Sequence, residues 1–92
     1  MNVALPGADL IERGLSDLVE GIPSIEALLV SIGAPRLRSA GIEVALAISE
    51  PERKLYELLA AQDPDSAHSR YNALIRRLVS FERAAECVNS RT

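Results

Sequence analysis

Residues 63–88 constrain the fold most, because they have the pattern of a single long helix. Asp63 suits the N-cap position, where its side chain would accept a hydrogen bond from the first turn, and Pro64 suits the first helical position. At about 100° per residue, one broad side of this helix is apolar and carries Ala67, Tyr71, Leu74, Ile75, Leu78, Val79, Phe81 and Ala85. That side covers roughly half the circumference, wider than the ~100° stripe of a helix that packs on one neighbour. We therefore predict that this helix contacts at least two others and is the most buried element.

The first fifty residues carry signals for two further helices. A helix from residue 8 or 9 to residue 20 is predicted by the spacing of Leu10, Ile11, Leu15, Leu18 and Val19, and Gly21 is placed to end it. Gly14 inside this helix costs about 1 kcal/mol relative to alanine, so we expect a neighbouring helix backbone to approach it closely. Ser24 is a natural N-cap for the second helix, whose buried stripe would be Ile25, Leu28, Leu29 and Ile32.

The remaining helix signals lie between residues 33 and 62. Gly33 is placed to end the second helix, and residues 34–41 then predict one or two separate turns, with Pro35 near the start and Gly41 past the end. Ser49 and Glu52 match a capping box for a helix that runs to residue 61 or 62. The predicted fold is all-α: a small bundle of four main helices plus one short helix, arranged as two helical hairpins.

Residues 42–48 are ambiguous. Ile42, Val44, Leu46 and Ile48 alternate with smaller or polar residues, as in a half-buried strand. A strand needs a hydrogen-bonded partner, which would be residues 2–5, the same segment of a second copy, or a strand of another protein. An extended connector over the helices, or a helical extension, fits the same residues. We treat these four residues as candidates for strand pairing with a partner.

The chain length of 92 residues predicts a single helical domain over residues 1–92. Residues 1–7 would form an N-terminal arm, residues 8–62 the packing helices and connector, residues 63–88 the long helix, and residues 89–92 a tail. A chain of this size buries only ~60–65% of the surface that its unfolded form exposes. We therefore expect modest stability, or stability that is shared with a partner.

Charge is unevenly distributed along the chain. The net charge is −3, but residues 1–50 hold seven acids and three bases, whereas residues 65–92 hold three acids and five bases. Four arginines on the predicted long helix, Arg70, Arg76, Arg77 and Arg83, form pairs seven residues apart that lie nearly above one another. Such guanidinium groups bind carboxylates of a partner polypeptide or consecutive phosphates of a nucleic acid. A solvated helix face is the simpler interpretation of the same pattern.

Glu82 is an exception on the apolar side of the long helix, where its angular position falls between Tyr71 and Ile75. A carboxylate at such a position needs either an opening to solvent or a paired cation. We expect one of these two arrangements.

Residues for catalysis or metal binding are few. His68 is the only histidine, no serine lies in a Gly-x-Ser-x-Gly pattern, and the five glycines do not cluster into a phosphate-binding loop. Helix capping accounts for Asp63 and Asp65, and the single Cys87 lacks an evident group that would lower its pKa. We predict no catalytic residues, no metal site and no cofactor.

The start of the chain lacks a basic segment followed by a sustained apolar one, and no apolar run approaches the ~20 residues of a membrane span. We therefore expect a cytoplasmic protein that does not associate with membranes. The predicted function is that of a small non-catalytic helical interaction protein, either a homodimer or an accessory subunit that docks on another polypeptide. The alternative is a nucleic-acid-binding module that uses the four arginines.

Overall fold

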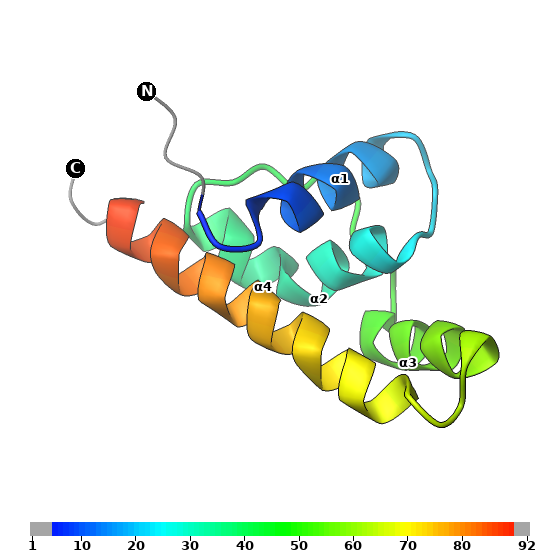
Figure 1. Ribbon diagram of the computed structural model, residues 1–92. Coiled ribbons are helices and arrows are strands. Elements are labelled where there is room, and N and C mark those ends of the chain that lie inside the picture. Colours follow the sequence, from blue (N-terminus) through cyan, green and yellow to red (C-terminus); the bar gives the residue numbers. More distant parts are fainter. Residues whose placement is uncertain (1–4, 90–92) are drawn as a thin grey trace.

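The computed structural model describes residues 5–89, and within this range the chain forms four helices and no strand (Figure 1). The helices are α1 (Ala8–Val19), α2 (Ile25–Ser39), α3 (Pro51–Gln62) and α4 (Ala67–Asn89). The predicted all-α bundle is confirmed. Residues 1–4 of the predicted arm and residues 90–92 of the predicted tail lie outside the described range.

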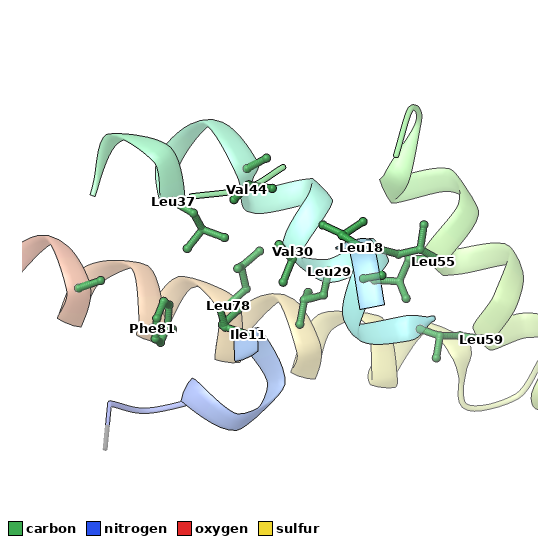
Figure 2. Close-up of a cluster of buried hydrophobic side chains, with 14 of the residues drawn as sticks. Ile11, Leu18, Leu29, Val30, Leu37, Val44, Leu55, Leu59, Leu78 and Phe81 are labelled. Carbon is green, nitrogen blue, oxygen red and sulfur yellow. The ribbon is translucent and has the colours of Figure 1, made fainter. Parts of the chain in front are cut away.

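The central element is α2, which packs against α1, α3 and α4 (Figure 1). Eight of its 15 residues are buried, and they face several directions around the helix: Ala27, Leu28, Leu29, Val30, Ser31, Gly33, Ala34 and Leu37. Figure 2 shows Leu29, Val30 and Leu37 of α2 among side chains from the other helices. The prediction that the C-terminal helix is the most buried was therefore wrong. As predicted, α4 contacts two other helices, α2 and α3, but most of its residues are half-buried or exposed.

Residues 34–39 continue α2 and do not form the separate short helix that the sequence predicted. The helix passes through both Gly33 and Pro35. A proline inside a helix costs about 3 kcal/mol. On either side of it, however, Ala34 and Leu37 are only 1% and 0% exposed, so breaking the helix would remove both from the core. Burial of these side chains outweighs the local cost of the proline.

Gly14 lies where α1 crosses α2, as the sequence predicted. A Cβ atom at this position would overlap the carbonyl oxygen of Glu26 and a methyl group of Val30. Because one of the obstructing atoms belongs to the backbone, the two helices approach this closely only with glycine here.

The end of α2 has the hydrogen bonds of a Schellman motif. Gly41, with φ of 88°, donates from its N–H to the carbonyl of Arg38, and the N–H of Ile42 donates to the carbonyl of Leu37. The motif brings the residue after the glycine back onto the last turn. Here both residues that meet, Ile42 and Leu37, are apolar and belong to the hydrophobic core or pack against it.

The end of α1 has the same motif with different side chains. Gly21, with φ of 75°, donates to the carbonyl of Leu18, and the N–H of Ile22 donates to the carbonyl of Asp17. At this end the residue that faces Ile22 is a carboxylate. Ile22 therefore lacks the apolar contact that usually completes the motif, and it remains 45% exposed.

The predicted starts of the last two helices are each displaced. Ser49 does not cap α3, because Pro51 occupies the first turn and Glu50 is the N-cap residue, with φ of 49°. The predicted cap Asp63 instead organises a turn before α4. Its carboxylate accepts hydrogen bonds from the N–H of Asp65 at 3.2 Å and from the hydroxyl of Ser66 at 2.9 Å. This turn takes up three residues that the sequence assigned to the helix.

Candidate interaction surfaces

An apolar hollow lies between the α1–α2 turn and the connector of residues 42–48. It has a volume of about 330 Å³ and is lined by Leu18, Gly21, Ile22, Pro23, Leu46, Ala47 and Ile48. Two of the five large hydrophobic residues that are exposed among residues 5–89 line it, Ile22 at 45% and Leu46 at 77%, and a third, Val19 at 75%, directly follows the lining residue Leu18 in the sequence. We call this hollow and these three side chains the apolar surface.

The apolar surface was not predicted as a unit. The sequence assigned Val19 to the buried stripe of its helix, yet this side chain is exposed, because it lies in the last turn of α1, beyond Leu18. The strength of the apolar pattern in residues 15–22 gave no sign of the exposure. Only the exposure of Ile22 had a signal in the sequence: Asp17 places a polar group opposite Ile22 at the helix end.

The connector forms no strand with any part of the chain that the structure describes. It is fixed to α2 at three points. The N–H of Ile42 donates to Leu37, the carbonyl of Val44 accepts from the Arg38 guanidinium at 3.0 Å, and the N–H of Ile48 donates to the Ser31 hydroxyl at 3.0 Å. Figure 1 shows the connector, in green, returning past α1 to the start of α3.

The four candidate strand-pairing residues do not share one environment. Val44 is 5% exposed, Ile42 and Ile48 are half-buried, and Leu46 is 77% exposed. The predicted alternation therefore holds for three residues and fails at Leu46, which points away from the core. Between the anchors at Val44 and Ile48, no backbone group of residues 45–47 hydrogen-bonds to another described residue. Their donors and acceptors remain open to solvent or to a partner strand, and pairing remains a prediction.

The four arginines are on α4 but do not act as one group. Arg70 is half-buried and donates to Gln62 at 3.0 Å, and Arg77 lies 3.7 Å from Asp9 of α1. Arg76 and Arg83 are exposed. A second hollow of about 340 Å³ is lined by Pro6, Gly7, Ala73, Arg76, Arg77 and Ser80. Two of the four predicted binding residues are thus brought to one hollow, and the other two are not.

An ionic network joins α2 to α4, and the sequence analysis identified only one of its members, Glu82. Arg36 binds Glu86 through two hydrogen bonds of 2.7 and 2.9 Å, and it binds Glu82 through one of 3.2 Å. Glu82 is only 4% exposed, and Gly33 leaves room for its carboxylate. Of the two arrangements expected for Glu82, the structure has the paired one. Its partner could not be named from the sequence, because Arg36 lies 46 residues away.

The environment shifts the pKa values of the Glu82 and Glu86 carboxyl groups in opposite directions. Burial raises the pKa of Glu82 and the charge of Glu86 adds to the rise, while Arg36 opposes it. The hydrogen bonds from Arg36 lower the pKa of Glu86. Ionisation is thus disfavoured at Glu82 and favoured at Glu86. The network fixes α2 against α4, and none of its three residues lines the apolar hollow.

Other chemistry is sparse in the described part of the chain. Within residues 5–89, no group of three or more His, Cys, Asp or Glu side chains is placed to hold a metal ion. His68 contacts the Asn72 amide at 3.2 Å, and Cys87 is exposed. None of the described helices is both long enough and apolar enough to cross a membrane.

Comparison with known proteins adds no relative: no family model, curated protein or solved structure matches this chain. Function is therefore inferred from the surfaces themselves.

Proposed function

We propose that this protein is a non-catalytic interaction protein that binds a polypeptide through the apolar surface. The observation that carries the proposal is the 77% exposure of Leu46 beside a hollow whose other walls are also apolar. Scattered exposed hydrophobic side chains are ordinary, but several that gather around one hollow mark a binding site. The polypeptide is either a second copy of this chain or a separate protein on which it docks.

The backbone next to Leu46 supports the same proposal. Residues 45–47 offer N–H and C=O groups that are not used within residues 5–89. A partner in extended conformation gains affinity from such groups and specificity from the side chains beside them. Anchoring at Val44 and Ile48 limits the conformational entropy that these residues would lose on binding.

The test is recovery of partners by the tagged protein from its native cell, combined with sedimentation velocity of the purified protein. Wild type would be compared with Leu46→Asp and with Val88→Asp, which places the same charge on an exposed valine of α4. We expect a stoichiometric polypeptide, or a homodimer, that Leu46→Asp abolishes and Val88→Asp retains. Recovery of the same partners by Leu46→Asp would refute the proposal.

Nucleic-acid binding is the second candidate, and the hollow beside Arg76 and Arg77 is the observation that favours it. It ranks lower because Arg70 and Arg77 already contact Gln62 and Asp9, and because the Tyr71 ring packs against that of Tyr56 and is not free to stack on a base. If this second candidate is correct, replacing the four arginines of α4 by alanine should abolish nucleic-acid binding. Removing one phosphate-binding arginine should reduce the log–log salt slope by about 0.9 on duplex DNA.

A further inference from the structure

The second hollow, which we call the arginine hollow, is lined on one side by a single face of α4. Ala73, Arg76, Arg77 and Ser80 line this side, and Pro6 and Gly7 line the other. Residues three, four and seven positions apart are neighbours on a helix surface. At about 100° per residue, Ala73 and Ser80 fall in the middle of this face and the two arginines fall on either side. Small side chains thus leave the space open, and guanidinium groups flank it.

The chain before α1 forms the opposite side of the arginine hollow. Gly7, with φ of 77°, lies so close to α4 that a Cβ atom there would be 3.2 Å from the carbonyl oxygen of Arg77. Figure 1 shows this start of α1, in blue, beside α4. Both sides of the hollow therefore belong to segments that pack directly on each other.

The polar groups of the hollow keep most of their hydrogen-bonding capacity. Within residues 5–89, the Arg76 guanidinium and the Ser80 hydroxyl form no hydrogen bond or ion pair. Arg77 lies 3.7 Å from the Asp9 carboxylate, which is too long for a hydrogen bond. The Asp9 side chain is 84% exposed, and such surface pairs contribute little. Two guanidinium groups and one hydroxyl are thus available to a ligand.

The charges around the hollow favour an anion. Residues 67–81 of α4 hold three arginines and no acid, and the two acids that follow on α4 are bound by Arg36. Asp9 offsets at most one of the two charges that line the hollow. The next charged residues along α1, Glu12 and Arg13, have opposite signs. An arriving anion would therefore meet a net positive charge.

We propose that the arginine hollow binds the phosphoryl group of a small phosphate monoester. Such a group carries about −1.5 to −2 charges at pH 7 and has three acceptor oxygens. Guanidinium groups bind these oxygens through paired hydrogen bonds, so Arg76 and Arg77 would hold the group from two sides. The Ser80 hydroxyl would donate to a remaining oxygen. A carboxylate, with two oxygens, would leave one of these donor groups unused.

The size of the hollow favours a small molecule. Its volume of about 340 Å³ is at the lower end of the ~300–1,000 Å³ range of ligand pockets. Pro6 and Ala73 offer apolar contacts to the carbon skeleton that carries the phosphoryl group. A nucleic-acid strand would need a row of phosphate contacts, but neither Arg70 nor Arg83 lines the hollow. Two arginines at one hollow match a single phosphoryl group.

This site goes beyond the proposed function and does not depend on it. None of the residues that line the arginine hollow lines the apolar hollow. Leu46→Asp should therefore bind a phosphate monoester as wild type does. Failure of the phosphoryl site would leave the proposed function standing.

The experiment is an NMR titration of the full chain with phenyl phosphate at constant ionic strength, which follows backbone amides and the Nε–H groups of the arginines. We expect saturable shifts at Gly7, Arg76, Arg77 and Ser80, with a Kd in the millimolar range or below. Inorganic phosphate should shift the same residues but bind more weakly, because it lacks the apolar part. Equal affinity for the two would overturn the assignment of a monoester.

Benzoate, which presents a carboxylate on the same ring, is the second probe. It should bind at least about fivefold more weakly than phenyl phosphate, because it has lower charge and fewer acceptor oxygens. Equal affinity for benzoate would overturn the assignment of a phosphoryl group. The absence of any saturable shift in the millimolar range would overturn the site itself.

Arginine variants test the geometry. Arg76→Ala and Arg77→Ala should each weaken phenyl phosphate at least about fivefold, or ~1 kcal/mol. Arg76→Lys keeps the charge but loses the paired hydrogen bonds, so it should also weaken binding. The control Arg83→Ala removes the same charge from an exposed position of α4 outside the hollow and should keep the wild-type affinity. Equal weakening by Arg83→Ala would mean that only net charge matters, and would overturn the proposal.

Asp9→Asn gives a test with the opposite sign. It removes the carboxylate that competes for Arg77 and repels the ligand, so phenyl phosphate should bind about twofold to fivefold more tightly. Unchanged or weaker binding would overturn the placement of the phosphoryl group beside Arg77. Circular dichroism would verify that each variant keeps its helix content, as expected at these exposed positions.

Nucleic acid is the alternative ligand that the same variants identify. Binding of duplex DNA that requires Arg70 and Arg83 as well as Arg76 and Arg77, in a protein that does not bind phenyl phosphate, would overturn the proposal. That result would favour the nucleic-acid candidate described above.

Discussion

Helix α2 and the connector of residues 42–48 are both rich in aliphatic residues, yet the fold treats them differently. Leu28, Leu29 and Leu37 of α2 are at most 3% exposed, whereas Leu46 of the connector is 77% exposed. The difference teaches that an aliphatic sequence identifies hydrophobic segments, but does not identify which surface will bury them. The side chains of α2 are buried by the rest of this chain.

Backbone hydrogen bonding explains the difference. A helix satisfies most of its own N–H and C=O groups, so α2 can be surrounded by other helices at no polar cost. In the connector, residues 45–47 make no backbone hydrogen bond within residues 5–89, so burying them would leave donors and acceptors unpaired. They remain at the surface, and their apolar side chains remain there with them.

The largest contrast is expected from the same leucine truncation in each region. Leu29→Ala removes a fully buried side chain and should lower the free energy of unfolding by about 2–5 kcal/mol. Leu46→Ala should change it by less than about 0.5 kcal/mol, because the side chain is already in water. Chemical denaturation with urea measures both. A loss of several kcal/mol from Leu46→Ala would show that the apolar surface is covered in the free protein.

The packing of α1 on α2 gives the next largest effect. Gly14→Ala should destabilise by about 2 kcal/mol, because the new methyl meets the backbone carbonyl of Glu26. The new methyl group of Gly33→Ala would meet only the ends of the Leu78 and Glu82 side chains, at 2.8 and 2.6 Å, and these ends can move. Its cost is also offset by the better helix propensity of alanine, about 1 kcal/mol. Thermal unfolding would contradict this account if the two variants lost equal stability.

Ser31 is the side chain that joins the two regions, and its loss should have an intermediate effect. Its hydroxyl donates to the Ala27 carbonyl at 2.8 Å and accepts from the Ile48 N–H at 3.0 Å. Ser31→Ala leaves that N–H without its partner and should cost about 1 kcal/mol. Amide hydrogen exchange at Ile48 should accelerate by more than the loss of global stability alone would cause. Ser39→Ala, at an exposed position of α2, is the control and should leave both measurements unchanged.

The smallest effects are expected from Glu82 and Glu86, the two carboxylates of α4 that bind Arg36 of α2, and these effects should have opposite signs. The pKa of Glu82 is raised by burial, so its ionised form opposes folding above that pKa, and Glu82→Gln should raise Tm at pH 7. This advantage should shrink as the pH falls through the raised pKa.

Glu86 is the matched comparison for Glu82. Because Arg36 lowers its pKa, the ionised form supports folding above the unfolded value, and that support is lost as the pH falls. Glu86→Gln should therefore lower Tm slightly at pH 7 and have no effect in acid. A fall in Tm at pH 7 for Glu82→Gln would show that the pair with Arg36 outweighs the burial of the carboxylate.

Much of the fold could be predicted because its signals are local. Gly21 ends α1 as predicted, Gly41 lies just past a helix end as predicted although that helix is α2, and Gly14 marks the helix crossing, since each of these roles depends on conformation or size at one residue. The division of α2 at Gly33 was wrong because the same local rules were applied where burial of Leu37 decides the outcome. Tertiary burial has no local signature.

The candidate site was less predictable for the same reason. The alternation of apolar residues singled out the connector as a candidate, but the exposure of Leu46 depends on how residues 45–47 pass between two anchors on α2. The arginine pattern was visible, whereas the contacts of Arg70 and Arg77 with Gln62 and Asp9 required the fold. Periodicity identified the residues, and the tertiary structure determined which of them are open to a partner.

Amide hydrogen exchange of the free protein, measured residue by residue by NMR, tests most directly whether the connector is left uncovered. The amides of Ala45, Leu46 and Ala47 should exchange almost as fast as in an unfolded chain, while those of Leu29 and Val30 should exchange only on global unfolding. A partner polypeptide that binds the apolar surface should then slow exchange at Leu46. Strong protection of residues 45–47 in the dilute protein without any partner would contradict the account, because it would mean that the chain covers this surface itself.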